Sequence, residues 1–119
     1  MFALNETAFL YPSLGQRSGK AAFAETGTIF RCRSEPAWAH RASGSAVERV
    51  ADIRIFANVS CESPVHAQLN PRPGDRIELN GRCYRIAEVQ PMRGWKGFHH
   101  LELLAKDEGP AGRVMSGNA

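Results

Sequence analysis

The chain has 119 residues, a formal net charge of +3 and a sequence pI near 9.0, a size that fits one domain with a modest core. Its composition, 43% hydrophobic and 23% charged, is that of a globular protein and excludes the intrinsically disordered class. No apolar run approaches the roughly 18 residues of a membrane-spanning helix, and the first residues lack the features of a signal peptide, so no membrane role is expected.

The first third of the chain alternates between apolar runs and turn residues. Residues 8–11 are apolar and predict either a strand or a docking arm, and residues 12–20, rich in turn formers, predict a loop or a wide hairpin tip. The next segment, residues 28–33, alternates, with Phe30 and Cys32 on one side and arginines on the other. This period of two predicts a strand.

The middle of the chain combines a predicted loop with a long strand. Residues 34–45 contain Pro36, Gly44 and several small residues, which predicts a loop, and Trp38 within it indicates a packed or contact-making one. Residues 52–59 alternate and are rich in β-branched side chains, so they predict a strand. The alternation changes phase between Val50 and Ile53, which predicts a bulge or bend.

The most legible local signal is a β-hairpin closed by Asn80 and Gly81, a dipeptide that tolerates the positive φ angles of a type I′ turn. Its register would place Leu79 opposite Arg82. One face would then hold the core residues Ile77, Leu79, Tyr84 and Ile86. The other face, polar apart from a cysteine, would hold Arg76, Glu78, Cys83 and Arg85. Three prolines in residues 61–73, before the hairpin, predict a surface crossing without a central strand.

The end of the chain predicts one more strand and a tail. Residues 92–97 read as a turn with Trp95 at its tip, and residues 98–104 as a final strand. From residue 106 the chain is small and polar, so residues 1–105 are interpreted as a single β-barrel domain and residues 106–119 as a flexible tail. With about five to seven short strands and no amphipathic helix, the expected fold is all-β, a small antiparallel β-barrel or sandwich with long loops.

The sequence does not indicate catalytic, metal-ligating or cofactor-binding residues. His99 and His100 are adjacent and would face opposite sides of a strand, and no zinc-ligand spacing is present. No nucleophile elbow or phosphate-binding loop occurs, and the acidic residues form no convergent pair on the predicted hairpin. The three cysteines are odd in number and widely spaced, which indicates partly buried thiols in a reducing compartment.

Tryptophans and basic residues in the predicted loops are the one positive indication of function. Such residues are enriched where proteins contact partners, and the candidates are Trp38, Arg41, Arg93, Trp95 and Lys96, with Arg17 and Lys20 in the first loop. The alternative is that each tryptophan folds back and plugs an end of the barrel. The positive charge is dispersed rather than clustered, so it is more typical of solubility than of a dedicated nucleic-acid surface.

The second half of the chain resembles a known family. A Gly-Asp start at Gly74, the Asn80–Gly81 turn, a Val-Gln-Pro exit ending at Pro91 and a closing His-containing strand follow one another. In this order they resemble the small head–tail joining proteins of long-tailed phages, also called head-closure, connector or minor capsid proteins. The resemblance covers roughly residues 46–105 and is weaker before them.

The resemblance implies a β-barrel virion protein without enzymatic activity. It would be made in the host bacterial cytoplasm and act at the head–tail junction as a hexameric or dodecameric ring, between the portal or adaptor and the tail-completion proteins. Residues 12–22 and 34–45 would reach neighbouring subunits, and Arg17 and Lys20 would face passing DNA without holding it, because transport requires release. A small OB-like or SH3-like barrel that binds nucleic acid or peptide as a regulatory module is the alternative function.

Overall fold

The computed structural model describes residues 4–43, 46–93 and 99–111, which form strands and no helix. The all-β class predicted from the sequence is therefore confirmed. The strands are β1 (Glu6–Tyr11), β2 (Ser13–Arg17), β3 (Lys20–Phe23), β4 (Thr28–Ser43), β5 (Ala46–Asn58), β6 (Arg76–Leu79), β7 (Arg82–Arg93) and β8 (His99–Pro110).

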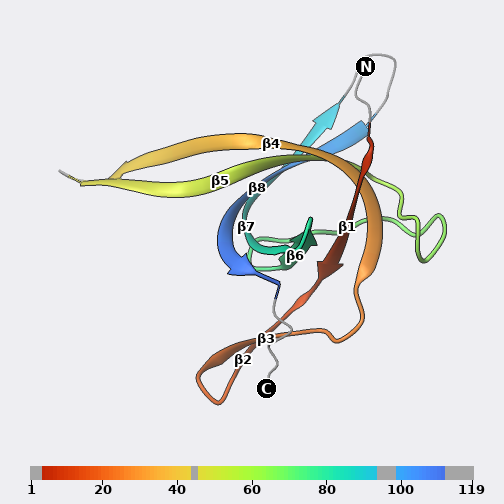
Figure 1. Ribbon diagram of the computed structural model, residues 1–119, viewed down its shortest axis with the longest axis horizontal. Coiled ribbons are helices and arrows are strands. Elements are labelled where there is room, and N and C mark those ends of the chain that lie inside the picture. Colours follow the sequence, from red (N-terminus) through yellow and green to blue (C-terminus); the bar gives the residue numbers. More distant parts are fainter. Residues whose placement is uncertain (1–3, 44–45, 94–98, 112–119) are drawn as a thin grey trace.

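Six of these strands close into an antiparallel barrel, in the order β1-β4-β5-β8-β7-β6 (Figure 1). The short β1 pairs with β4 on one side and with β6 on the other, so this strand closes the barrel. Of the two predicted architectures, barrel and sandwich, the barrel is correct. The apolar run at residues 8–11 lies within β1 and is a barrel strand rather than a free arm.

The β6–β7 hairpin has the predicted turn and register. Asn80 and Gly81 have φ angles of 53° and 77°, as a type I′ turn requires. Leu79 pairs with Arg82 and Ile77 with Tyr84. The predicted inner face contributes to the core, although Tyr84 is only partly buried. On the outer face Cys83 is also buried, at 6% exposure, so that face is less open than the alternation suggested.

The barrel interior is filled by the inward residues of all six strands. Their alternation matches the sequence pattern, because Phe30 and Cys32 of β4 and Ile55 and Ala57 of β5 are buried at alternate positions. The crossing at residues 61–73 contains no named strand, as predicted, and it adds Cys61 and Leu69 to the same core. The main cluster consists of Ala8, Leu10, Phe30, Cys32, Ile55, Ala57, Cys61, Leu69, Ile77, Leu79, Ile86, Leu101 and Leu103.

The prediction of a loop over residues 34–45 is wrong for residues 34–43, and residues 44–45 lie outside the described part of the chain. Strand β4 continues to Ser43 and pairs with β5 as far as the pair Ser43 and Ala46. Pro36 was interpreted as a strand breaker, but β1 leaves β4 at Cys32, so Pro36 lies on a free edge where its missing N–H costs no ladder bond. The predicted bulge is confirmed, because the register shifts where Ala39 and His40 face Ala51 and Arg49.

The predicted tail also begins too early. Strand β8 continues through residues 106–110, where it pairs with β7 up to Arg82 and Pro110. The Ala111 N–H then donates to the Gly81 carbonyl at 2.8 Å. Small and polar residues were interpreted as unstructured, but a neighbouring strand supplies the hydrogen bonds that hold them. Residues 112–119 lie outside the described residues.

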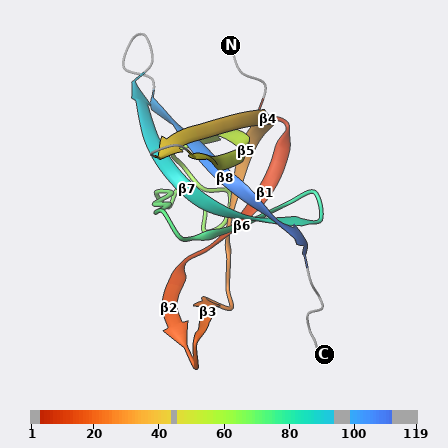
Figure 2. The same cartoon turned by 90° about the vertical axis from the view of Figure 1, so that its left-hand side faces the viewer.

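Two hairpins extend beyond the barrel. The far parts of β4 and β5, residues 37–43 and 46–51, continue past the barrel wall, and we call them the β4–β5 extension (Figure 1). The second is the β2–β3 hairpin, which leaves the barrel after β1 and forms a sheet of its own (Figure 2). Of the two predictions for residues 12–20, loop or hairpin tip, the hairpin tip is correct. The molecule measures 46 × 41 × 22 Å.

We expect Gly81→Val to destabilise the barrel by about 1–2 kcal/mol or more, because a β-branched residue resists the φ of 77° at this position. No atom lies within 4 Å of a Cβ built on Gly81, so the loss would come from backbone strain and not from a clash. Urea denaturation measures the effect. Gly81→Asn is the matched control, because asparagine adopts positive φ more readily; equal losses in both variants would contradict the turn as the cause.

Candidate functional site

The β2–β3 hairpin presents two positive charges side by side at its tip. Arg17 and Lys20 are a cross-strand pair, separated by a two-residue turn in which Ser18 and Gly19 have φ angles of 53° and 77°. Every residue from Pro12 to Ala21 is exposed. Like charges directly opposite each other destabilise a hairpin, so this pair concentrates positive charge at the tip at a cost in stability.

The base of the same hairpin is fixed by a buried carboxylate. Asp75 is 5% exposed and is the one buried charged side chain among the described residues. Its Oδ1 accepts a hydrogen bond from the Ser13 N–H at 2.8 Å, and its Oδ2 accepts one from the Arg72 N–H at 2.9 Å. Asp75 thus ties the first residue of β2 to the loop that precedes β6.

Phe23, at the other leg of the hairpin, packs on two arginines. The guanidinium carbons of Arg76 and Arg85 lie 4.1 and 4.8 Å from the centroid of its ring. Arg85 also forms an ion pair with Glu108 at 3.1 Å. Cation–π contacts of this kind hold the β3 end against the outer face of β6 and β7. The hairpin is therefore anchored at both legs and exposed at its tip.

The β4–β5 extension carries Trp38 and Arg41 away from the barrel. Arg41 pairs in register with Glu48 on β5; the side chains of both candidates lie outside the described part of the chain. At the base of the extension Ala37, Ala51 and Leu104 form a second small core cluster. This cluster packs the extension against β8 just before the two separate.

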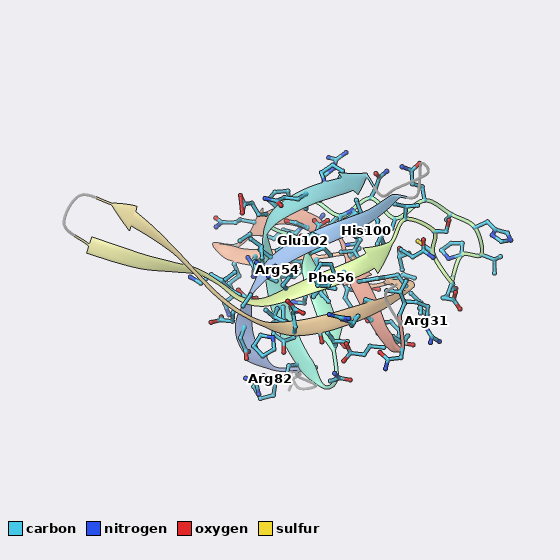
Figure 3. The ribbon with its side chains drawn as sticks, turned by 90° about the horizontal axis from the view of Figure 1, so that it is seen from above. Arg31, Arg54, Phe56, Arg82, His100 and Glu102 are labelled. Carbon is cyan, nitrogen blue, oxygen red and sulfur yellow. The ribbon has the colours of Figure 1, made fainter. Side chains whose placement is uncertain are left out.

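An aromatic and charged network covers the outer face of β4, β5 and β8 beside this base (Figure 3). The guanidinium carbon of Arg33 lies 5.6 Å from the centroid of the Phe56 ring, and the ring of His100 lies 6.2 Å from it. Arg54 Nε lies 2.7 Å from Glu102 Oε2, and Arg54 Nη1 lies 3.5 Å from an oxygen of Glu35. These contacts link three strands across the face and leave a partly exposed surface that is neither purely apolar nor strongly charged.

A groove of about 470 Å³ opens where the extension separates from β8; its lining is Ser34, Glu35, Pro36, Asp52, Ile53, Tyr84 and Asp107. Asp107 accepts two hydrogen bonds from the Arg82 guanidinium, at 2.9 and 3.0 Å, and these lower the pKa of its carboxyl. The Asp107 N–H in turn donates to Asp52 at 2.8 Å. Burial, together with the charge of Asp107, raises the pKa of the Tyr84 phenol. The groove's acids are thus engaged in holding the strands at this junction.

Glu6 forms a second carboxylate node, at the start of β1. It accepts hydrogen bonds from the Ser34 N–H at 2.6 Å, from the Ser34 hydroxyl at 2.8 Å and from the Asn80 amide at 3.0 Å. Partial burial raises the pKa of Glu6, but the hydrogen bonds from Ser34 and Asn80 outweigh it, so that the pKa lies below its ordinary value of 4.5. One side chain thus joins β1, β4 and the β6–β7 turn.

The predicted contact residues do not converge on one site. Arg17 and Lys20 meet at the β2–β3 tip, whereas Trp38 and Arg41 lie on the β4–β5 extension. Arg93 is the last residue of β7, and Trp95 and Lys96 lie outside the described residues. The anchoring residues Glu6, Phe23 and Asp75 were not predicted as functional, since their roles arise from contacts between distant segments.

The described residues hold no group of three or more side chains suited to a metal ion, and no described helix is long and apolar enough to cross a membrane. All three cysteines are free and buried, more fully than the predicted partial burial, and burial raises the pKa of Cys32 to about 12. Comparison with protein-family models, with curated proteins and with solved structures gives no match. The geometry of the barrel and its hairpins therefore carries the functional argument.

We expect Glu6→Gln to lower the free energy of unfolding at pH 7 by about 1–2 kcal/mol, because charged hydrogen bonds to Ser34 and Asn80 are weakened. Since folding depresses the pKa of Glu6 below 4.5, its stabilisation is complete above that pH and is lost as the pH falls through the lower, folded-state value. Urea denaturation from pH 7 to pH 3 should show the gap between the two proteins closing at the acid end.

The control for this series is Glu25→Gln, a change of the same kind at an exposed residue in the turn before β4. It should leave the free energy of unfolding within about 0.5 kcal/mol of the unaltered protein at every pH. A gap between Glu6→Gln and the unaltered protein that stays constant down to pH 3 would contradict the role of the Glu6 charge.

Proposed function

We propose that this protein is a non-enzymatic structural subunit that assembles into a ring and joins the head of a long-tailed phage to its tail. The observation that carries the proposal is the combination of a closed barrel with two projecting hairpins whose bases are fixed to it. Closure satisfies the strand edges of the barrel itself, so the unpaired edges are concentrated on the projections. Such a subunit is suited to contact neighbours through its projections.

The sequence resemblance supports the same function, and the fold agrees with what that family would require. Residues 12–22 and 34–45, expected to reach neighbouring subunits, correspond to most of the β2–β3 hairpin and of the β4 half of the extension. The proposed partners are copies of the same chain, the portal or adaptor on the head side and the tail-completion proteins on the other. The ring would be hexameric or dodecameric.

The exposed pair Arg17 and Lys20 supports weak, non-specific contact with DNA passing through the ring. Two charges at a narrow tip provide few phosphate contacts, and affinity for DNA rises steeply with the number of phosphates neutralised. A tip of this kind can line a conduit without arresting the strand. A regulatory barrel that binds single-stranded nucleic acid would instead need a basic groove with stacked aromatic residues.

Electron microscopy of the purified protein, alone and mixed with portal rings, tests the proposal. We expect rings, or a ring-shaped layer on the portal, and only weak DNA binding at physiological salt. A monomer that ignores portal rings at every concentration tried would contradict the proposal. Tight binding to single-stranded DNA with a steep salt dependence would instead favour the regulatory module.

Shortening the β2–β3 hairpin should separate assembly from folding. We expect replacement of residues 15–21 by Asn-Gly to keep the anchors Ser13 and Phe23 and to change the melting temperature by only a few degrees, because the removed residues lie outside the core. Ring formation, followed by light scattering, should be lost.

Val65→Ser alters a side chain that is 71% exposed in the residue 61–73 crossing, and as the surface control it should assemble normally. Normal rings from the shortened protein would contradict a role for the hairpin.

A further inference from the structure

On the β4–β5 extension, strand β5 has an edge that pairs with no other described strand. Strand β5 pairs with β8 only from Ile53 to Asn58, because β8 turns away with β7 beyond Ala105. Residues 46–51 of β5 therefore have β4 on one side and, among the described strands, none on the other. The backbone groups on that side resemble those of an edge strand, which can pair with another chain.

Close to the barrel, the open edges of β8 and β4 are obstructed. On β8, the Asp107 N–H is already bonded to Asp52, and Gly109, with a φ of 107°, bends the strand. On β4, the Ser34 N–H is bonded to Glu6 and Pro36 has no N–H to offer. Bonded donors, proline and bends are the devices by which natural sheets prevent edge pairing. Residues 46–51 of β5 contain neither proline nor glycine, and their one irregularity is the bulge at Val50, where Ala39 and His40 face Ala51 and Arg49. The outer edge of β4 beyond Pro36, residues 37–43, is also open among the described strands, but it carries the basic Arg41 where β5 carries Glu48.

The β2–β3 hairpin has one obstructed and one open edge as well. The β2 edge is irregular, with a register shift between Ser13 and Gln16 and with Gly15 at a φ of 84°. Strand β3 is regular, and its two central residues are alanines, whose side chains are small. Arg17 and Lys20 flank a two-residue turn and therefore form a hydrogen-bonded pair. In an antiparallel ladder the next residue, Ala21, then directs its N–H and C=O away from β2.

We propose that β3 of one subunit pairs with residues 46–51 of β5 in the next subunit, extending its sheet beyond the point where β8 departs. This inference rests on the proposed ring and names its interface. The two edges leave the barrel from different places (Figures 1 and 2), so each subunit offers one edge to either neighbour. A contact between two different surfaces of the same chain is heterologous and generates a closed ring or a filament.

Charge also favours this pairing over a symmetric one. Residues 13–23 carry Arg17 and Lys20 and no acidic residue, whereas residues 46–52 carry Glu48 and Asp52 against the single Arg49. Pairing β3 with β5 of another subunit thus brings a basic hairpin to the strand that carries Glu48, whose register partner Arg41 lies on the opposite side, on β4. Pairing β3 with β3 would instead bring the Arg17 and Lys20 charges of two subunits together, which is unfavourable. Edge pairing uses only backbone groups, so the Arg17 and Lys20 side chains stay available to DNA.

Disulfide crosslinking under conditions in which rings form tests this interface. The three native cysteines are buried, so engineered surface thiols would be the reactive ones. Chains carrying Ala21→Cys together with one cysteine placed in turn at residues 46–50 are oxidised and separated on denaturing gels. We expect a ladder of multimers for the one position of β5 that lies opposite Ala21, because a disulfide needs directly opposed Cβ atoms and a head-to-tail contact links every subunit to two others. Each single variant should remain a monomer.

The matched control combines Ala21→Cys with Lys106→Cys on the obstructed β8 edge, and it should form no ladder. Rings that form without any crosslink between Ala21 and β5 would overturn this interface and leave the proposed function standing. A protein that never assembles, alone or on portal rings, would overturn both. Dimers from a single cysteine variant would show a symmetric contact and would also overturn the interface.

A backbone variant tests the hydrogen bonds directly. Ala21→Pro removes the outward N–H of β3 and leaves the bonds between β2 and β3 in place, so the melting temperature should change little. Assembly should require at least about tenfold more protein. Ala21→Ser, which keeps the N–H at the same exposed position, is the control and should assemble as the unaltered protein does. Equal assembly by the proline variant would overturn the proposed pairing.

Discussion

Closure of the barrel by β1 is the interaction on which the rest of the structure depends. This strand has only six residues and must pair on both sides. A carboxylate lies at each of its ends, one from the strand itself and one from the loop before β6. Glu6 binds β4 and the β6–β7 turn at its start, and Asp75 binds the chain just after its end. Each carboxylate accepts hydrogen bonds from backbone or amide N–H groups of another element. Losing either carboxylate would therefore weaken the contact between whole elements and not a single hydrogen bond.

The closed seam determines where the protein can meet a partner. Once β1 pairs with β4 and β6, the barrel leaves few free backbone groups. Two of their N–H donors are bonded to Asp52 and Glu6, and Pro36 has no N–H to offer. What remains open lies on the β2–β3 hairpin and the β4–β5 extension. Assembly through these projections costs the barrel nothing, since the core clusters lie within its walls and at the base of the extension. A rigid body with open projections is what a ring subunit needs.

The sequence could predict the parts of this fold that are determined locally. Asn80 and Gly81 fix a turn by their own φ preferences, and the alternation around Ile55 follows from burial of one face. The predictions of a loop at residues 34–45 and of a tail that includes residues 106–110 were wrong. The strand conformation found there depends on pairing with β5 and β7, and on Pro36 lying at an edge. The roles of Glu6 and Asp75 were also out of reach, since their partners lie 28 and 62 residues away.

The tip of the β2–β3 hairpin shows how one element can serve two kinds of contact. Its backbone edge along β3 and its side chains at Arg17 and Lys20 point to different uses, because hydrogen bonding along a strand leaves side chains free on both faces. Holding two like charges together has a cost in the free subunit. In the proposed ring that cost would be offset, because the hairpin would be held between neighbours with its charges facing phosphates, so assembly and the weak hold on DNA would reinforce each other.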